Sequence, residues 1–227
     1  MKTLSPRFFL ILAGCVLLLA AAAPAAQSLG NGNCRVDNIN GNIQITPPGC
    51  SYSGPDDLVH GQGDLSWDPR HAHFNNVAVH AGGVLQGTVD SFDSAVIITV
   101  RGNGRLEGYE STVTIPAKCE AHAGPWSVDD QPISFQTEMM RLEGQLEDDG
   151  NSDFSYLRVV AGTEYGYPSP GHTTASTQDG KSYVVDSMFE MGFRIEYVGA
   201  PGGPLAGYEG AFEGTAVMKA FANPEGR

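Results

Sequence analysis

Hydrophobic and polar residues alternate along segment 186–197. One series of alternate positions holds Ser187, Phe189, Met191, Phe193, Ile195 and Tyr197, and the other holds Asp186, Glu190, Arg194 and Glu196. Successive side chains of a β-strand point to opposite faces, so this segment can bury one face only as a strand whose other face meets water. The pattern predicts a half-exposed strand of an antiparallel sheet.

Turn-forming residues divide the rest of the chain into similar segments. We expect strands at roughly 73–81, 84–91, 95–101, 109–117, 133–146, 154–161, 172–178, 182–198 and 209–222. The run 96–100 is hydrophobic at successive positions, which is typical of a strand covered on both faces. No window has the three-to-four spacing of an amphipathic helix. The sequence therefore predicts an all-β fold, an antiparallel two-sheet β-sandwich, jelly-roll-like or similar, with about 9–11 strands.

A short motif occurs twice. Residues 104–110 read Gly-Arg-Leu-Glu-Gly-Tyr-Glu, and residues 203–209 read Gly-Pro-Leu-Ala-Gly-Tyr-Glu. Each copy lies between two alternating segments, and its glycines allow backbone turns that a Cβ would obstruct. We expect two equivalent hairpins on a pseudo-symmetric framework.

The N-terminus predicts a leader peptide. Lys2 and Arg7 precede a hydrophobic run at 8–23, and small residues follow it. We expect a signal peptide at 1–25, an N-terminal hairpin and irregular loop segment at 26–70, and the β-sandwich domain at 71–227. The run is shorter than the roughly 20 residues of a membrane-spanning helix, so we expect no membrane span and a secreted protein, extracellular or periplasmic. Lipid attachment at Cys15 is the alternative.

The charge of the chain restricts its partners. It has 26 acidic and 13 basic residues, and removal of Lys2 and Arg7 would leave 11 basic residues. A surface this negative repels nucleic-acid phosphates, so we expect no nucleic-acid partner.

Three cysteines follow the leader, and an oxidising compartment favours pairing two of them. Cys34 and Cys50 enclose a turn-rich segment, and we expect a disulfide between them. A bond from Cys119 to either one is the alternative.

Two groups of residues could bind a metal. His71 and His73 would share one face of a regular strand, where two imidazoles could hold zinc or copper with help from His60, His80 or His122. Asp148, Asp149 and Asp153 surround a glycine and could hold calcium, although the same residues form an ordinary turn. The sequence requires no other cofactor.

Catalytic groups are less evident. Two of the predicted strand carboxylates, Glu138, Glu143, Glu190 and Glu196, could form the acid pair of a glycoside hydrolase. Ser169 and His172 lack a nucleophile elbow. We identify no catalytic residue.

Aromatic residues in loops could form a binding surface. Trp126, Tyr165 and Tyr167, with His172, lie in or near the loops 119–130 and 163–172. Their rings could stack on a sugar or anchor a protein partner.

Several segments together carry a resemblance: 119–125, 157–166, 168–174, 185–189 and 199–207. Across residues 75–222 the chain resembles a group of secreted bacterial β-rich proteins of unknown function. The resemblance implies a β-rich fold and transfers no activity. The sequence as a whole predicts an exported, non-enzymatic protein with a role in recognition or cell-surface structure. The alternatives are a glycan-active hydrolase or carbohydrate-binding module, and a calcium- or transition-metal-binding module.

Overall fold

The structure is a computed structural model that describes residues 34–37, 50–54, 59–60, 63–127, 129–146, 152–177 and 180–222. It is built from β-strands, with two single-turn 3₁₀ helices, and no α-helix occurs in these ranges. The all-β prediction is confirmed. None of the helical segments in the described part is long and apolar enough to cross a bilayer.

The described residues form eleven strands, within the expected range of about 9–11. They are β1 (Cys34–Asp37), β2 (Cys50–Ser53), β3 (Val59–His60), β4 (Leu65–Gly82), β5 (Gly87–Gly102), β6 (Glu110–Ala123), β7 (Ile133–Gln145), β8 (Phe154–Ala161), β9 (Pro170–Ser176), β10 (Ser182–Gly199) and β11 (Glu209–Ala222). The 3₁₀ helices are η1 (Gly104–Leu106) and η2 (Thr163–Tyr165).

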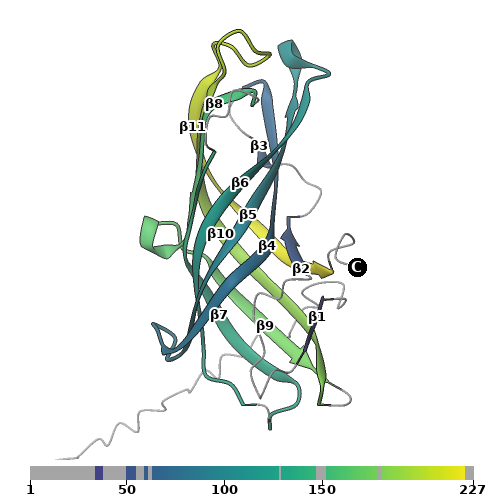
Figure 1. Ribbon diagram of the computed structural model, residues 1–227, viewed down its shortest axis with the longest axis vertical. Helices are drawn as coiled ribbons and strands as arrows, with labels where there is room; N and C mark the ends of the chain where they lie inside the picture. The colour runs from purple at the N-terminus through teal and green to yellow at the C-terminus, as the bar shows by residue number, and fades with distance from the viewer. Residues whose placement is uncertain are drawn as a thin grey trace, which may run out of the picture.

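Hydrogen bonding joins the strands into one sheet that closes on itself (Figure 1). The order is β1-β10-β11-β2-β4-β5-β6-β7-β8, and β8 also pairs with β10, which completes a ring. β9 bridges β7 and β10 farther along the same strands. The expected pair of separate sheets is therefore corrected. Strands as long as β4 and β10, 18 residues each, twist and curl enough for a single sheet to wrap around its own core.

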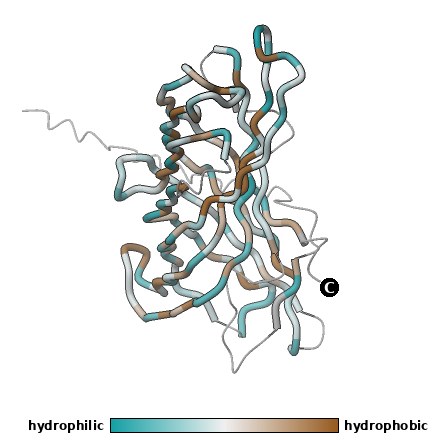
Figure 2. Tube along the Cα trace, turned by 45° about the horizontal axis from the view of Figure 1, so that its top comes forward, coloured by the Kyte–Doolittle hydropathy of each residue, from teal (hydrophilic) through white to brown (hydrophobic). Residues whose placement is uncertain are grey.

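The predicted alternation in β10 is confirmed: its side chains point alternately to the inner and the outer face of the sheet. Its inward side chains are all buried, namely Ser187, Phe189, Met191, Phe193, Ile195 and Tyr197. Figure 2 shows hydrophobic and hydrophilic residues alternating along the long strands. The core thus fills the interior of the closed sheet.

β5 differs from expectation in two ways. The expected strands 84–91 and 95–101 are one strand, Gly87–Gly102. Val96, Ile98 and Val100 are buried inside, whereas Ile97 is half-buried on the outer face. The prediction that segment 96–100 is covered on both faces is therefore wrong. The segment is a one-sided strand with a β-branched residue on the solvent side.

The predicted disulfide between Cys34 and Cys50 is present, with Cα atoms 5.6 Å apart. It links β1 and β2, which pair with β10 and β11 respectively. The bond is consistent with folding in an oxidising compartment. The N-terminal segment thus contributes strands to the same sheet, and the region expected to be irregular up to residue 70 contains β2, β3 and the start of β4. The leader, Cys15 and residues 38–49 of the expected N-terminal hairpin segment lie outside the described residues.

Candidate functional site

The repeated motif forms two loops at the same end of the closed sheet (top of Figure 1). The first loop, residues 103–109, connects β5 to β6. Gly102 N donates a hydrogen bond to Tyr109 O at 2.8 Å, and Tyr109 N donates to Leu106 O at 2.9 Å. A Cβ on Gly102 would overlap the carbonyl oxygen of Leu106, so this close turn requires glycine.

The second loop, residues 200–208, connects β10 to β11 and repeats this scheme. Gly199 N donates to Tyr208 O at 2.8 Å, and Tyr208 N donates to Leu205 O at 2.9 Å. A Cβ on Gly199 would overlap the carbonyl oxygen of Leu205. The equivalence predicted from the repeated motif is therefore present in the backbone.

Each loop is tied to the start of a neighbouring strand in the same way. Asn103 N donates to Asp64 O at 2.6 Å beside β4, and Ala200 N donates to Asp153 O at 2.7 Å beside β8. The residues that follow repeat the pattern: Ser66 Oγ donates to Arg101 O at 3.3 Å, and Ser155 Oγ donates to Val198 O at 3.4 Å. Two related halves thus form this end of the sheet.

A tyrosine from each loop forms a hydrogen bond with the other half of the molecule. Tyr109 Oη donates to Asp153 Oδ2 at 2.9 Å, and Tyr208 Oη donates to Asp64 Oδ2 at 3.2 Å. Each tyrosine therefore bonds the aspartate whose carbonyl group holds the opposite loop. We call these two contacts the tyrosine latches.

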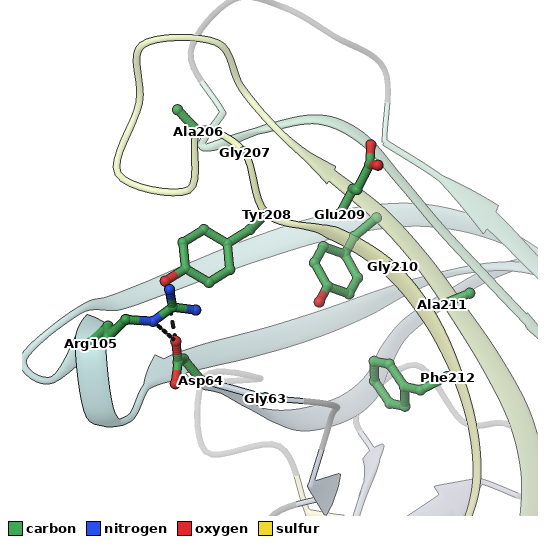
Figure 3. A pocket seen from close by; sticks show the side chains of 11 residues that line it. Gly63, Asp64, Arg105, Ala206, Gly207, Tyr208, Glu209, Gly210, Ala211 and Phe212 are labelled. Atoms are coloured by element: carbon green, nitrogen blue, oxygen red, sulfur yellow. Dashed lines mark hydrogen bonds and ion pairs between the residues drawn. The ribbon is translucent and has the colours of Figure 1, made fainter.

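Two positions of the motif differ in charge between the halves. The first loop has Arg105 and Glu107 where the second has Pro204 and Ala206. Arg105 Nε donates to Asp64 Oδ2 at 2.8 Å, and its Cζ lies 5.8 Å from the centroid of the Tyr208 ring. Figure 3 shows the guanidinium between this ring and the Asp64 carboxylate. The hydrogen bond from Arg105 to Asp64 raises the arginine pKa, so the cation is permanent.

A cleft of about 560 Å³ opens beside this ion pair. Gly63, Asp64 and Arg105 line one side, and residues 206–212 line the other (Figure 3). Tyr197 and Phe212, whose side chains are mostly buried, also line it. The cleft combines aromatic rings, a fixed carboxylate–guanidinium pair and exposed backbone at glycines. Such a site offers apolar faces together with donors and acceptors for hydroxyl groups.

The interior contains a separate cluster around His71. Its Nε2 lies 2.7 Å from Ser94 Oγ and 3.6 Å from Cys119 Sγ, and Ser94 Oγ lies 3.2 Å from the same sulfur. Burial lowers the pKa of His71 to about 3 and raises the pKa of Cys119 to about 12. Imidazole and thiol are therefore both neutral, and this cluster lacks the thiolate that nucleophilic catalysis needs.

The structure separates the two proposed histidine ligands. His71 is buried, but His73 is exposed, because His73 adopts φ 58° at a register shift that follows Ala72. Asp153 belongs to a tyrosine latch, and Asp148 and Asp149 lie outside the described residues. In the described part of the chain no three His, Cys, Asp or Glu residues converge as a metal site would require.

The residues expected to form a binding surface lie in three places. Tyr165 Oη donates to Glu143 Oε2 at 2.7 Å on the outer face. Tyr167 Oη donates to Glu213 Oε1 at 2.8 Å from the same loop. The Trp126 ring stacks on Phe135 with centroids 6.0 Å apart, and Nε2 of the half-buried His172 lies 2.9 Å from Ser134 Oγ.

Two of the candidate glycosidase carboxylates are neighbours. Arg158 lies between them, with Nη2 2.6 Å from Glu143 Oε1 and Nη1 3.7 Å from Glu196 Oε2. Hydrogen bonds from Arg158 and Arg194 lower the pKa of Glu143 and of Glu196 respectively. Glycoside hydrolysis needs one carboxyl with a raised pKa as the general acid, so this pair does not meet the requirement.

Comparisons with protein-family models, with curated proteins and with solved structures find no match. Sequence reasoning missed Asp64 and Arg105 because they lie in different segments of the chain. The repeated motif could have indicated Arg105, because a charged residue stands there where the second copy has Pro204.

Proposed function

We propose that this chain is an exported, non-enzymatic recognition protein that binds saccharide in the cleft beside Asp64 and Arg105. Export follows from the predicted leader at 1–25 and agrees with the Cys34–Cys50 disulfide. The observation that carries the proposal is the placement of the Arg105 guanidinium between the Tyr208 ring and the Asp64 carboxylate.

This geometry suits a saccharide in particular. A sugar ring presents an apolar C–H face and hydroxyl groups that both donate and accept hydrogen bonds. Tyrosine rings offer apolar area, while carboxylate and guanidinium groups pair with hydroxyls. Because Asp64 and Glu209 accompany a single cation, the cleft does not favour a polyanion, in keeping with a net charge of −13.

Part of the Arg105 guanidinium is free to bind a ligand. Only its Nε has a hydrogen-bond partner among the described residues, so the two terminal nitrogens remain available to a ligand. Asp64 and the Tyr208 ring fix the orientation of the group, which reduces the entropy lost on binding.

The proposal is tested on a glycan array followed by titration calorimetry. The variant is Arg105→Ala, and the matched control is Arg101→Ala, which removes another exposed arginine whose Nε lies 2.9 Å from Glu110 Oε2. We expect saccharide binding that Arg105→Ala weakens about tenfold or more and that Arg101→Ala leaves unchanged. Absence of binding to every glycan, or equal effects of the two variants, would refute the proposal.

A further inference from the structure

A second hollow adjoins the cleft on the outer face of the sheet. Its volume is about 400 Å³, and Tyr156, Glu196 and Val198 line it. It shares Tyr197 and residues 209–211 with the cleft, so the two hollows meet at the start of β11.

Three residues at the start of β11 line both hollows, namely Glu209, Gly210 and Ala211. Gly210 and Ala211 have no side chain larger than a methyl group. Gly210 is exposed, and a Cβ at this position would lie 3.2 Å from Tyr197 Oη. A ligand can therefore cross the first residues of β11 close to the backbone.

Regular strand alternation directs Tyr156 toward the second hollow. Leu157 and Val159 are buried, and Tyr156 is half-buried on the opposite, outer side of β8. Its partner on β10 is the exposed Val198. The register shift between Val198 and Gly199 lies beyond Tyr156 and turns Phe154 inward.

The second hollow has the same chemistry as the cleft. Tyr156 Oη donates to Glu196 Oε2 at 3.4 Å, and Arg194 Nε holds the other oxygen of this carboxylate at 2.9 Å. Val198 is 37% exposed and adds apolar area beside the tyrosine. An aromatic ring next to a fixed carboxylate is again suited to a sugar.

We propose that the ligand is a linear saccharide chain of several units, bound from the Arg105 cleft across Gly210 and Ala211 to Tyr156. This inference rests on the proposed function, because it extends the same site. The cleft holds one end of the chain and the second hollow holds the other.

The test compares short and long ligands. Cello-oligosaccharides and N-acetyl-chito-oligosaccharides of two and of six units are titrated by calorimetry against the full exported chain. We expect the hexasaccharide of the recognised series to bind at least tenfold more tightly than the disaccharide. Tyr156→Ala should weaken hexasaccharide binding about tenfold and disaccharide binding less than twofold, whereas Arg105→Ala should weaken both.

Two further variants separate binding from folding. Ala211→Phe places a ring beside Glu196, which pairs with residue 211 and lies on β10. The ring should block the path between the hollows, so the hexasaccharide should no longer bind more tightly than the disaccharide. Tyr156→Phe keeps the ring and should retain hexasaccharide affinity, with melting curves recorded for each variant. If both ligand lengths bind equally and neither Tyr156→Ala nor Ala211→Phe changes the ratio, the inference is wrong while the proposed function stands. If neither series binds at any length, both are overturned.

Discussion

Tyr208 Oη donates a hydrogen bond of 3.2 Å to Asp64 Oδ2, and 144 positions of the chain separate the two residues. The contact has a counterpart in Tyr109 and Asp153. Together the two tyrosine latches fix the loops at one end of the closed sheet. In one latch Asp64 also accepts a hydrogen bond from Arg105. The carboxylate that stabilises the fold therefore also orients the cation of the proposed site.

Removal of either latch should cost stability by a similar amount. Tyr208→Phe and Tyr109→Phe should each lower the free energy of unfolding by about 1–2 kcal/mol, because each deletes one hydrogen bond to a carboxylate. The double variant should be additive, since the latches share no residue. Urea denaturation measures these values. Only Tyr208→Phe should also reduce ligand affinity, and an equal reduction in Tyr109→Phe would contradict the assignment of the cleft.

The close turns at Gly102 and Gly199 should reject even a methyl group. Gly102→Ala and Gly199→Ala should each destabilise the protein by about 3 kcal/mol, because the new Cβ overlaps a backbone carbonyl oxygen that cannot move freely. Gly203→Ala is the control, since the nearest atom to its Cβ lies 3.4 Å away. Thermal unfolding compares the three variants, and a similar loss in all of them would show that the overlap is relieved.

Asp90 should make stability fall as pH rises through about 6. Its side chain is 2% exposed, its Oδ1 has no hydrogen-bond partner among the described residues, and burial raises its pKa to about 6 from 3.8. A carboxyl with a higher pKa in the folded than in the unfolded state stabilises the folded protein. This stabilisation is complete below the unfolded pKa and is lost as pH rises through the folded pKa. The change amounts to at most about 3 kcal/mol.

Asp90→Asn should remove this dependence. The variant should be more stable than the wild type at pH 7.5 and should lose this advantage near pH 4, because the amide stays neutral throughout. Chemical denaturation at both pH values measures the difference, and the exposed Asp130→Asn serves as a control. If Asp90→Asn matches the wild type at both pH values, Asp90 does not carry the predicted penalty.

Cys119 should be unreactive in the folded protein. Its thiol is 2% exposed and its pKa is about 12, so thiolate is scarce at pH 8. A thiol reagent such as DTNB should label Cys119 only after denaturation, and Cys34 and Cys50 should stay unlabelled without a reductant. Peptide mass analysis identifies the labelled residue. Rapid labelling of Cys119 under native conditions would show that the interior opens readily.

Short-range patterns predicted the local structure well. The alternation at 186–197 gave the inward and outward faces of β10, and the repeated Gly-x-Leu-x-Gly-Tyr-Glu motif indicated two equivalent loops. Both follow from interactions between near neighbours, because strand periodicity and glycine turns depend on a few adjacent residues.

Bulges limited the accuracy of the site predictions. His71 and His73 share a face only in a regular strand, and the positive φ at His73 separates them. The register shift beside Gly199 likewise turns Phe154 inward, out of the alternation that Leu157 and Val159 follow. A single additional residue reverses the faces of the residues that follow it, and no hydrophobic pattern marked these two positions in advance.

By itself the sequence determined the all-β class, the buried face of β10, the acidic charge and the two equivalent loops. Each of these is a property of residues near one another in the chain. Only the tertiary structure decided that the strands close into one sheet, that Asp64 meets Arg105 and Tyr208, and that Tyr156 faces a second hollow. These outcomes depend on strand order and register across the whole sheet, and local periodicity does not specify which distant strands pair.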